Sequence, residues 1–321
     1  MKTRVLVLGS AGFVGRHIVQ HLEQSAWAEP ILSQHRKTNP SKAEKLASVT
    51  LDATNFDQLS RAADGINFVI NCVAGSKSTI IDNAKALAKL ARSQDRLRIV
   101  HLSSMAVYGG GATGTITEKA PLKPGEDDYS KAKVFADHLM QDCGAIVLRP
   151  GIIYGLGSRI WTDRLTSLLR SRRLGDLGAL GDGYCNLAYV KDVAFAAERA
   201  LLISEDNLGC ALNLCAPDQP TWNEYFIQCA RAMRYTPVKR ISPKQLWAET
   251  RLFAVPLKVL DILMERSSCN LESFPKPIAQ SQLNLFRQRI RLDSQRATDL
   301  LKVNWTPLAT ALREIHQDNL L

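Results

Sequence analysis

Three glycines near the start of the chain constrain its fold more than any other feature. Gly9, Gly12 and Gly15 follow an unbroken apolar run at residues 5–8 and precede a helical pattern that begins at Phe13. Such a run is typical of a parallel strand buried on both faces. The amino end of a helix presents unpaired N–H groups and a positive dipole, and glycines let a pyrophosphate approach them. The stretch therefore predicts a dinucleotide site, with a tight glycine-rich turn as the alternative.

Strand-like and helix-like patterns alternate from this point up to residue 150. Further strands are predicted at residues 30–35, 49–51, 66–71, 98–103 and 145–148, and helices at residues 56–64, 79–93 and 127–142. Alternation at this spacing implies right-handed crossovers and an open parallel sheet. The predicted fold class is therefore α/β, a doubly wound, Rossmann-type sheet, and residues 1–150 are expected to form this dinucleotide-binding domain.

The pattern changes after Pro150, where turns multiply and arginines cluster between residues 159 and 173. Residues 187–202 predict a strand followed by a helix, and residues 211–214 predict a strand able to join the main sheet. Residues 187–216 are therefore expected to return to the first domain, while 151–186 and 217–321 form a smaller, mostly helical substrate lobe. The apolar segment 252–264 is interpreted as a core or lid helix, with a peripheral membrane anchor as the alternative.

Composition narrows the class of protein. Hydrophobic residues make up 45% of the chain and charged residues 22%, as in ordinary globular proteins. No apolar run reaches the ~18–20 residues of a membrane span, and no signal peptide is expected before the first strand. The seven cysteines lack the paired spacing of metal sites, which favours reduced thiols and a cytoplasmic location. The net charge of +10 comes without a nucleic-acid-binding motif, so an anionic cofactor or substrate is favoured over nucleic acid, anionic lipid or a solvated face.

A tyrosine and a lysine four residues apart suggest acid–base chemistry. Tyr129 and Lys133 would share one face of the predicted helix at residues 127–142. A phenol with a pKa of ~10 is a poor acid or base at neutral pH, but a nearby ammonium lowers that pKa. The strand at residues 98–103 carries the hydroxyls of Ser103 and Ser104 to the carboxyl edge of the sheet, where the glycine turn also lies. Taken singly, each feature is also compatible with a surface helix or an ordinary serine cap.

Together these motifs resemble the extended short-chain dehydrogenase/reductase superfamily, in the branch called the NAD-dependent epimerase/dehydratase family. The resemblance runs along nearly the whole chain and is carried by residues 9–15, Asp52, Ala74 with Gly75, 104–109, Tyr129 with Lys133, 149–155 and 189–193. It implies a nicotinamide cofactor, with contacts from Gly9, Ser10, Gly12, Phe13, Val14, Gly15, Asp52, Ala53, Ala74, Tyr129, Lys133 and Pro150.

The resemblance also implies a mechanism, in which hydride moves between the nicotinamide and a substrate carbon. Tyr129 would exchange a proton with the oxygen on that carbon, and Ser104, a better match than Ser103, would orient the oxygen. Lys133 would hold the cofactor ribose and lower the pKa of Tyr129. The expected function is an NAD(P)-dependent oxidoreductase acting on a small carbonyl or hydroxyl compound, sugar derivatives included. The alternatives are a nucleotide-sugar epimerase or dehydratase with a tightly bound cofactor, and a non-catalytic cofactor-sensing protein.

The sequence departs from the family pattern after the turn at residues 181–183. Nucleotide-sugar epimerases usually carry an Arg-Asp-Phe segment there, with the arginine on the nucleotide, whereas this chain has residues 184–188 without an arginine. A required nucleotide on the substrate is therefore not expected. The arginines between residues 159 and 173 are interpreted either as selecting a substrate carboxylate or phosphate or as an exposed face. Alternation at Arg287, Arg289 and Arg291 predicts a strand with one charged side, open to the same two interpretations.

Cofactor preference is read from the end of the second strand. NAD sites usually place an acidic residue there to bind the ribose 2′-hydroxyl, but residues 33–37 contain none. Arg36 can pair bidentately with a 2′-phosphate, assisted by His35 or Lys37, so NADP is expected, with NAD and a solvated basic loop as the alternatives. The expected partner is a small-molecule substrate, with no nucleic acid and no membrane span. A homodimer and peripheral membrane association remain open.

Overall fold

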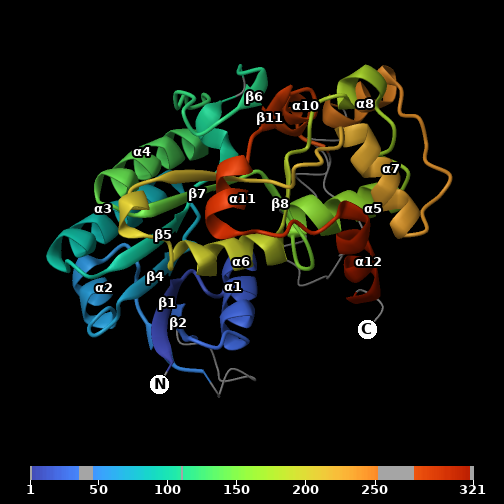
Figure 1. The fold of residues 1–321 in the computed structure, drawn as a ribbon. Helices are drawn as coiled ribbons and strands as arrows, with labels where there is room; N and C mark the ends of the chain where they lie inside the picture. The colour runs from blue at the N-terminus through green and yellow to red at the C-terminus, as the bar shows by residue number, and fades with distance from the viewer. Residues whose placement is uncertain (1, 36–45, 110, 252–277, 319–321) are drawn as a thin grey trace, which may run out of the picture.

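The computed structural model describes residues 2–35, 46–109, 111–251 and 278–318. Seven parallel strands form one sheet in the order β10-β7-β5-β4-β1-β2-β3 (Figure 1). These strands are β1 (Thr3–Leu8), β2 (Ala28–Gln34), β3 (Ser48–Thr50), β4 (Phe68–Asn71), β5 (Arg98–Leu102), β7 (Ile146–Pro150) and β10 (Ala211–Leu214). The strand order reverses between β1 and β4, and ligands of such sheets bind at the carboxyl edge beside that point. The predicted α/β, doubly wound class is confirmed.

Helices cover both faces of the sheet (Figure 1). Helices α1 (Phe13–Glu23) and α6 (Val190–Ala200) pack on one face, and α2 (Phe56–Ala62), α3 (Lys77–Ser93) and α4 (Asp128–Asp142) pack on the other. Because β1 is buried on both sides, its alternate residues enter different cores. Val5 and Val7 belong to the cluster under α1 and α6, and Leu6 and Leu8 belong to the cluster under α2, α3 and α4.

A smaller lobe lies beside the sheet domain, at the right of Figure 1. Its described helices include η2 (Arg159–Asp163, a π-helix), α5 (Arg164–Arg170), α7 (Trp222–Ala232), α8 (Pro243–Arg251), α10 (Gln280–Phe286) and α12 (Leu308–Asp318). Helix α11 (Gln295–Leu301) packs back on β10 and α6. The lobe core is aromatic, with Trp222, Tyr225, Phe226 and Phe286 all buried. The apolar segment predicted at 252–264 lies outside the described residues.

Two short parallel pairs were not anticipated from the sequence. Strand β8 (Ile152–Tyr154) pairs with β9 (Leu187–Tyr189), and β6 (Gly114–Ile116) pairs with β11 (Ile290–Leu292). The strand expected at the start of residues 187–202 is therefore present but lies outside the main sheet. The strand expected from the arginine alternation is only partly right, because Arg291 lies in β11 while Arg287 and Arg289 precede it.

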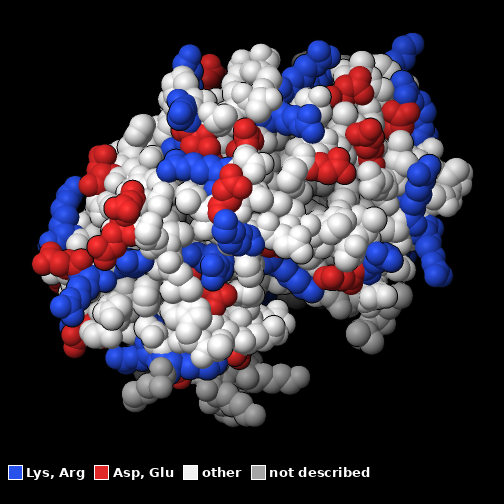
Figure 2. All heavy atoms as spheres, viewed as in Figure 1, with Lys and Arg blue, Asp and Glu red and all other residues white. Residues whose placement is uncertain are grey.

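Charged side chains are mixed on the face of the molecule seen in Figure 2. Lys and Arg are interspersed there with Asp and Glu over the sheet domain and the lobe, so the net charge of +10 is not gathered on one element of that face. Among the helices described, none has the length and apolar character that crossing a membrane requires.

Candidate active site

The glycine loop between β1 and α1 is tightly packed. Gly9 has a φ of +76°, and a Cβ added to it would lie 3.0 Å from the backbone of Cys72. A Cβ on Gly15 would lie 2.2 Å from the carbonyl oxygen of Gly9, so the first turn of α1 sits directly on the loop. Gly12 is the N-cap of α1, and among the described residues no side chain caps this helix. The free N–H groups and the close backbone packing fit a bound dinucleotide pyrophosphate.

Ser10 and Ser33 fix the loop against β2. The hydroxyl of Ser10 donates to the carbonyl oxygen of Ser33 at 2.7 Å, and the backbone N–H of Gly9 donates to Ser33 Oγ at 3.1 Å. Both serines are buried. Phe13 and Val14 begin α1 and are half-buried, Phe13 against the lobe core and Val14 against the core beneath α1 and α6. Ser10 thus shapes the loop through β2.

Three further residues expected to contact the cofactor, Asp52, Ala53 and Ala74, lie at the next strand ends. Asp52 follows β3, and its Oδ1 accepts hydrogen bonds from the backbone N–H and the hydroxyl of Thr54, at 2.9 and 2.7 Å, which lower its pKa. The carbonyl oxygen of Ala53 accepts from Asn83 Nδ2 on α3 at 2.9 Å, and Ala74 is exposed after β4. Arg36 lies outside the described residues.

Helix α4 brings Tyr129 and Lys133 to the same edge. Asp127 caps the helix by accepting from the N–H of Ser130 at 2.8 Å. The ammonium of Lys133 lies 5.9 Å from the centre of the Tyr129 ring and donates to the carbonyl oxygen of Leu102, the last residue of β5, at 2.7 Å. Lys133 is only 3% exposed, and this burial lowers its pKa from 10.5 to about 8.

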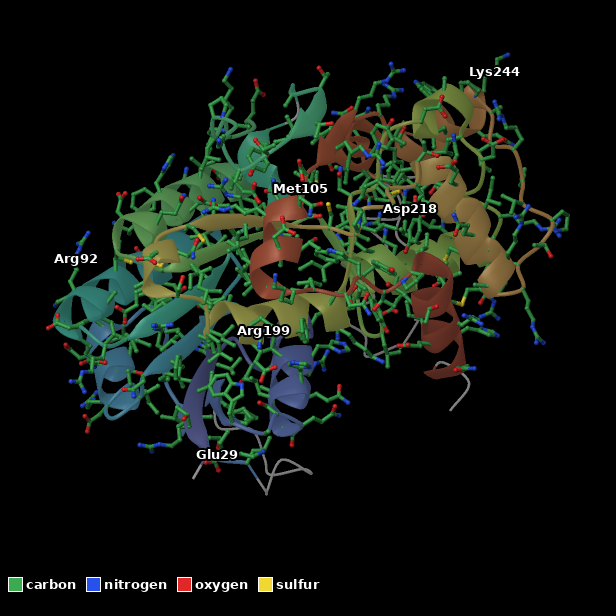
Figure 3. All side chains as sticks on the ribbon, in the orientation of Figure 1. Glu29, Arg92, Met105, Arg199, Asp218 and Lys244 are labelled. Carbon is green, nitrogen blue, oxygen red and sulfur yellow. The ribbon has the colours of Figure 1, made fainter. Side chains whose placement is uncertain are left out.

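Ser104 completes the group. It caps η1 (Met105–Tyr108), where its Oγ accepts from the N–H of Ala106 at 3.2 Å, and its hydroxyl is near enough to the Tyr129 phenol to act on its pKa. Met105 lies between the sheet and the lobe in Figure 3, whereas Glu29 in β2 lies at the opposite end of the molecule. Ser103 does not share this position, because its hydroxyl donates to Asp137 at 2.6 Å.

The expected lowering of the Tyr129 pKa by Lys133 is wrong for this structure. Tyr129 is 42% exposed, yet the surrounding protein atoms remove enough water from its phenol to raise its pKa above 10.0. The neighbouring Ser104 hydroxyl lowers the pKa but does not outweigh this burial, and Asp127 raises it further. The ammonium of Lys133 is engaged by Leu102 instead of the phenol.

Sequence reasoning missed Asp137 and Arg149 as a buried ion pair behind this group. Arg149 Nη2 and Asp137 Oδ1 are 2.6 Å apart, with both side chains at most 2% exposed. Pro150 was expected to contact the cofactor. Pro150 is buried at the end of β7, and Arg149 points to Asp137. The signal in the sequence was the four-residue step from Lys133 to Asp137, which continues the spacing from Tyr129.

The motif at residues 189–193 has a structural function. The hydroxyl of Tyr189 donates to Glu314 on α12 at 2.8 Å. Asp192 accepts from the hydroxyl and the N–H of Thr306, at 2.6 and 2.9 Å. These contacts fasten the C-terminal segment to α6.

The segment after the turn at residues 181–183 is occupied by contacts with β11. Asn186 is 1% exposed and has a φ of +47°; its Nδ2 donates to the carbonyl of Ile290 and its Oδ1 accepts from the N–H of Leu292, both at 2.8 Å. Tyr184 carries the guanidinium of Arg291 over its ring at 5.5 Å. The family-type arginine is thus replaced by residues that hold a strand of the protein itself.

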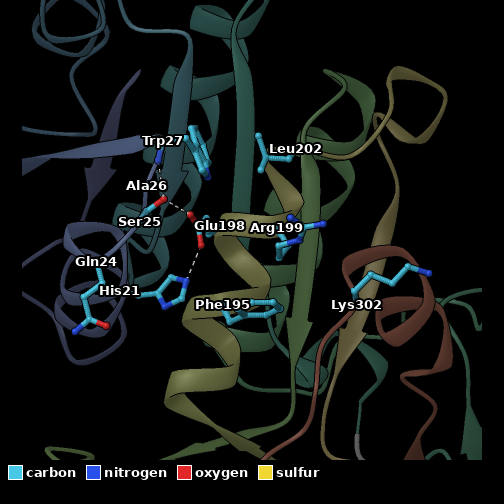
Figure 4. Close-up of a pocket in the computed structure, with 10 residues that line it drawn as sticks. All are labelled: His21, Gln24, Ser25, Ala26, Trp27, Phe195, Glu198, Arg199, Leu202 and Lys302. Carbon is cyan, nitrogen blue, oxygen red and sulfur yellow. Dashed lines mark hydrogen bonds and ion pairs between the residues drawn. The ribbon is translucent and has the colours of Figure 1, made fainter. Parts of the chain in front are cut away.

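A separate cavity of about 480 Å³ lies between the C-terminal ends of α1 and α6 (Figure 4). Glu198 is central to it and accepts from Ser25 Oγ at 2.5 Å and contacts His21 Nε2 at 2.7 Å. The neighbouring Trp27 precedes β2, so this cavity is at the amino edge of the sheet, away from Ser104 and Tyr129.

Comparison with known proteins identifies the family and relatives that share the fold. Residues 5–214 match the NAD dependent epimerase/dehydratase family. The chain is 28% identical to a ceramide reductase of Caulobacter vibrioides over 162 residues, which is 48% of this chain and 47% of that protein, so the match spans about half of the relative. It is 24% identical to dTDP-glucose 4,6-dehydratase of Neisseria gonorrhoeae over 265 residues, 68% of this chain and 75% of that one. The structure of UDP-glucuronic acid 4-epimerase of Bacillus cereus, in complex with UDP-glucuronic acid and NAD, shares the fold with a TM-score of 0.71, at 18% identity and with 99% and 100% of the two chains covered.

Proposed function

The chain belongs to the NAD dependent epimerase/dehydratase family, and on that premise we propose that it is an NADP-preferring oxidoreductase that interconverts a carbonyl and a hydroxyl group on a small substrate. One observation carries this proposal. The Ser104 hydroxyl lies near enough to the Tyr129 phenol to act on its pKa, and Lys133 follows Tyr129 by one turn of α4, at the edge of the sheet where the uncapped α1 begins. All three residues are present, so the sequence gives no support to the non-catalytic alternative.

Each residue of this group has a distinct proposed role. A bound nicotinamide supplies or accepts the hydride. Tyr129 gives a proton to, or takes one from, the substrate oxygen, and Ser104 holds that oxygen by a hydrogen bond. Lys133 binds the cofactor ribose and, as an ammonium, favours the phenolate of Tyr129 once both are held around the same ligand. The pKa of about 8 leaves Lys133 mostly charged at neutral pH.

The proposed preference for NADP over NAD rests on the residues at the end of β2. Residues 33–37 offer no carboxylate to a ribose 2′-hydroxyl, whereas His35, Arg36 and Lys37 offer donors to a 2′-phosphate. We expect NADPH to bind more tightly than NADH in a fluorescence titration, and Arg36→Glu to reverse the order. Equal or tighter binding of NADH by the unaltered protein would return the assignment to NAD.

The substrate is proposed to need no nucleotide. This inference is supported by Asn186 and Tyr184, whose side chains engage β11 at the place where sugar-nucleotide enzymes of the family carry an arginine. The partial match to a reductase acting on ceramide is also in keeping with a substrate that carries no nucleotide.

A nucleotide-sugar epimerase or dehydratase is the second candidate. It is favoured by the longer match to a dTDP-glucose 4,6-dehydratase. The two candidates differ in cofactor use. An epimerase or dehydratase that recycles its cofactor converts substrate without added NADPH, and the purified protein then carries nicotinamide absorbance.

The deciding experiment is a substrate panel of aldehydes, ketones, free sugars and nucleotide sugars, followed by NADPH absorbance and product chromatography. We expect turnover of compounds without a nucleotide, and turnover confined to nucleotide sugars would overturn that part of the proposal. On the substrate so found, Tyr129→Phe is expected to lower kcat by roughly 100-fold or more while NADPH still binds. The matched control is Tyr235→Phe in the lobe, which should keep wild-type turnover. Near-normal turnover by Tyr129→Phe would remove the proton-transfer role.

A further inference from the structure

Asp137 is a fully buried carboxylate on α4 whose two oxygens accept four hydrogen bonds. Arg149 donates from Nε to Oδ2 at 2.9 Å and from Nη2 to Oδ1 at 2.6 Å. Ser103 Oγ donates to Oδ2 at 2.6 Å, and Gln141 Nε2 donates to Oδ1 at 2.7 Å. A carboxylate held on all sides in this way has one fixed orientation.

The same pair touches both segments that carry the proposed acid–base group. Asp137 follows Lys133 by one turn of α4, so its position is rigidly tied to the position of that lysine. Ser103 immediately precedes Ser104 in the chain. On the far side, Arg149 Nη1 donates to the hydroxyl of Tyr108 at 2.9 Å, and Tyr108 ends the short helix that Ser104 caps.

Stability alone is a weak reason for such a pair. Removing two charges from water costs several kcal/mol, and well-packed apolar residues of similar volume are often as stabilising. The surroundings here are apolar enough for that exchange, since Ala136 and Met140 on the same helix are fully buried. A fixed relative position of α4 and the end of β5 is what an apolar replacement would not supply.

We propose that Asp137, Arg149 and Ser103 form a positioning unit that sets α4, which carries Tyr129 and Lys133, relative to Ser104 after β5; this inference rests on the function proposed above. These residues act through the acid–base group and do not themselves touch substrate. In the unit, Ser103 links the carboxylate to β5, and Arg149 links it to β7 and to η1.

Asp137 also contributes to the charge around Lys133. The ammonium of Lys133 interacts electrostatically with three titratable groups. These are Cys72 after β4, His101 on β5 and Asp137 on α4. Burial raises the pKa of the Cys72 thiol to about 12 and lowers the pKa of His101 well below 6.5, so both are neutral at pH 7. Asp137 is therefore the anion among them that favours the ammonium form of Lys133.

The test measures Lys133 directly, in the full chain and without substrate. The protein is labelled with [¹³Cε]lysine, and the Lys133 resonance is assigned by its loss in Lys133→Met. Asp137→Asn is expected to lower the pKa of Lys133 by about one unit and to weaken binding of NADPH, or of NADH if that binds more tightly, about fivefold at pH 7.5. Asp137→Glu keeps the charge and should restore most of both values.

Ser103→Ala covers the case in which Asp137→Asn does not fold. It removes one hydrogen bond and leaves the ion pair, and we expect about threefold weaker cofactor binding. Its matched control is Ser25→Ala, which removes another serine–carboxylate hydrogen bond, to Glu198 at the opposite edge of the sheet (Figure 4). Ser25→Ala should leave cofactor affinity and the Lys133 titration unchanged.

Two results separate this inference from the proposed function. Folded variants at Asp137 and Ser103 with a lower Tm but wild-type Lys133 titration and cofactor affinity would show a merely structural role and overturn the inference. If Tyr129→Phe keeps its turnover while Asp137→Asn still moves the Lys133 titration, the proposed function fails and the positioning unit stands.

Discussion

Replacing the buried lysine of the site is expected to make the protein more stable. Lys133 is 3% exposed, and its pKa falls from 10.5 to about 8 on folding because burial penalises the ammonium. One pKa unit corresponds to about 1.4 kcal/mol, so keeping this lysine charged in the folded protein costs about 3 kcal/mol. Lys133→Met keeps the length of the side chain without the charge. Loss of the hydrogen bond to Leu102 offsets about 1 kcal/mol, leaving a net gain in the free energy of unfolding of about 2 kcal/mol at pH 7.

The gain must depend on pH in a defined direction. The pKa of Lys133 is lower in the folded protein than in the unfolded chain, so between pH 8 and 10.5 the unfolded chain holds a proton that the folded protein has lost. The stability of the wild type relative to Lys133→Met therefore rises with pH through this window and is lowest below pH 8. From pH 7 to pH 9.5 the difference should shrink by about 2 kcal/mol, which brings the two proteins close to equal stability.

Urea unfolding followed by circular dichroism at pH 7.0 and pH 9.5 measures both quantities. The matched control is Lys131→Met, on the same helix but exposed, which removes a lysine without removing a buried charge. A Lys133→Met protein that is less stable than the wild type by the same amount at both pH values would refute the claim that burial of the Lys133 ammonium destabilises the folded protein. The variant should also lose most of its cofactor affinity. Such a loss would mean that the destabilising buried charge is needed for cofactor binding.

Two further substitutions test the glycine loop and the C-terminal attachment. Gly→Ala inside a helix usually stabilises, but Gly15→Ala places a Cβ 2.2 Å from the carbonyl oxygen of Gly9, so we expect a lower Tm and NADPH binding weakened more than tenfold. Gly111→Ala, where nothing lies within 4 Å of the added Cβ, is its control, and equal behaviour of the two variants would contradict the packing argument. Thr306→Val removes the hydroxyl that donates to buried Asp192 at 2.6 Å and should lower the free energy of unfolding by roughly 1–2 kcal/mol. Titration of that variant with NADPH should give the wild-type Kd, and a changed Kd would mean that this contact reaches the cofactor site.

The fold was predictable because local patterns and tertiary structure agree in the first half of the chain. An apolar run, a glycine triplet and a helical period specify β1, the loop and α1 without reference to distant residues. The strand pairs outside the main sheet were less predictable for a physical reason. Strands β6, β8, β9 and β11 have three residues each, too few to show a period of two, and their pairing partners lie up to 176 residues away, as for Gly114 and Ile290.

The candidate site divides in the same way. Ser104, Tyr129 and Lys133 were identifiable because spacing along one helix, or position at a strand end, fixes where a side chain begins. Asp137 and Arg149 were not identified as a pair, because the four-residue step from Lys133 places Asp137 on a helix face but does not say which strand residue it meets. Asp192 was noticed as part of a motif, but its partner Thr306 lies 114 residues later.

The pKa of Tyr129 is raised where the spacing to Lys133 predicted a lowering, because the spacing does not show where the ammonium donates its hydrogen bond. Two side chains on one helical face are near neighbours. The electrostatic effect of the ammonium on the phenol, however, depends on the position of the group that accepts a hydrogen bond from the ammonium. The ammonium of Lys133 donates to the carbonyl oxygen of Leu102 at 2.7 Å and lies 5.9 Å from the centre of the Tyr129 ring. Burial therefore has the largest effect on the pKa of the phenol. A ligand with hydroxyl groups between the two side chains would give Lys133 an acceptor nearer to the phenol. Under the proposed function, the acid–base pair is therefore completed by the cofactor ribose, and the protein alone holds its two members ready at a fixed separation.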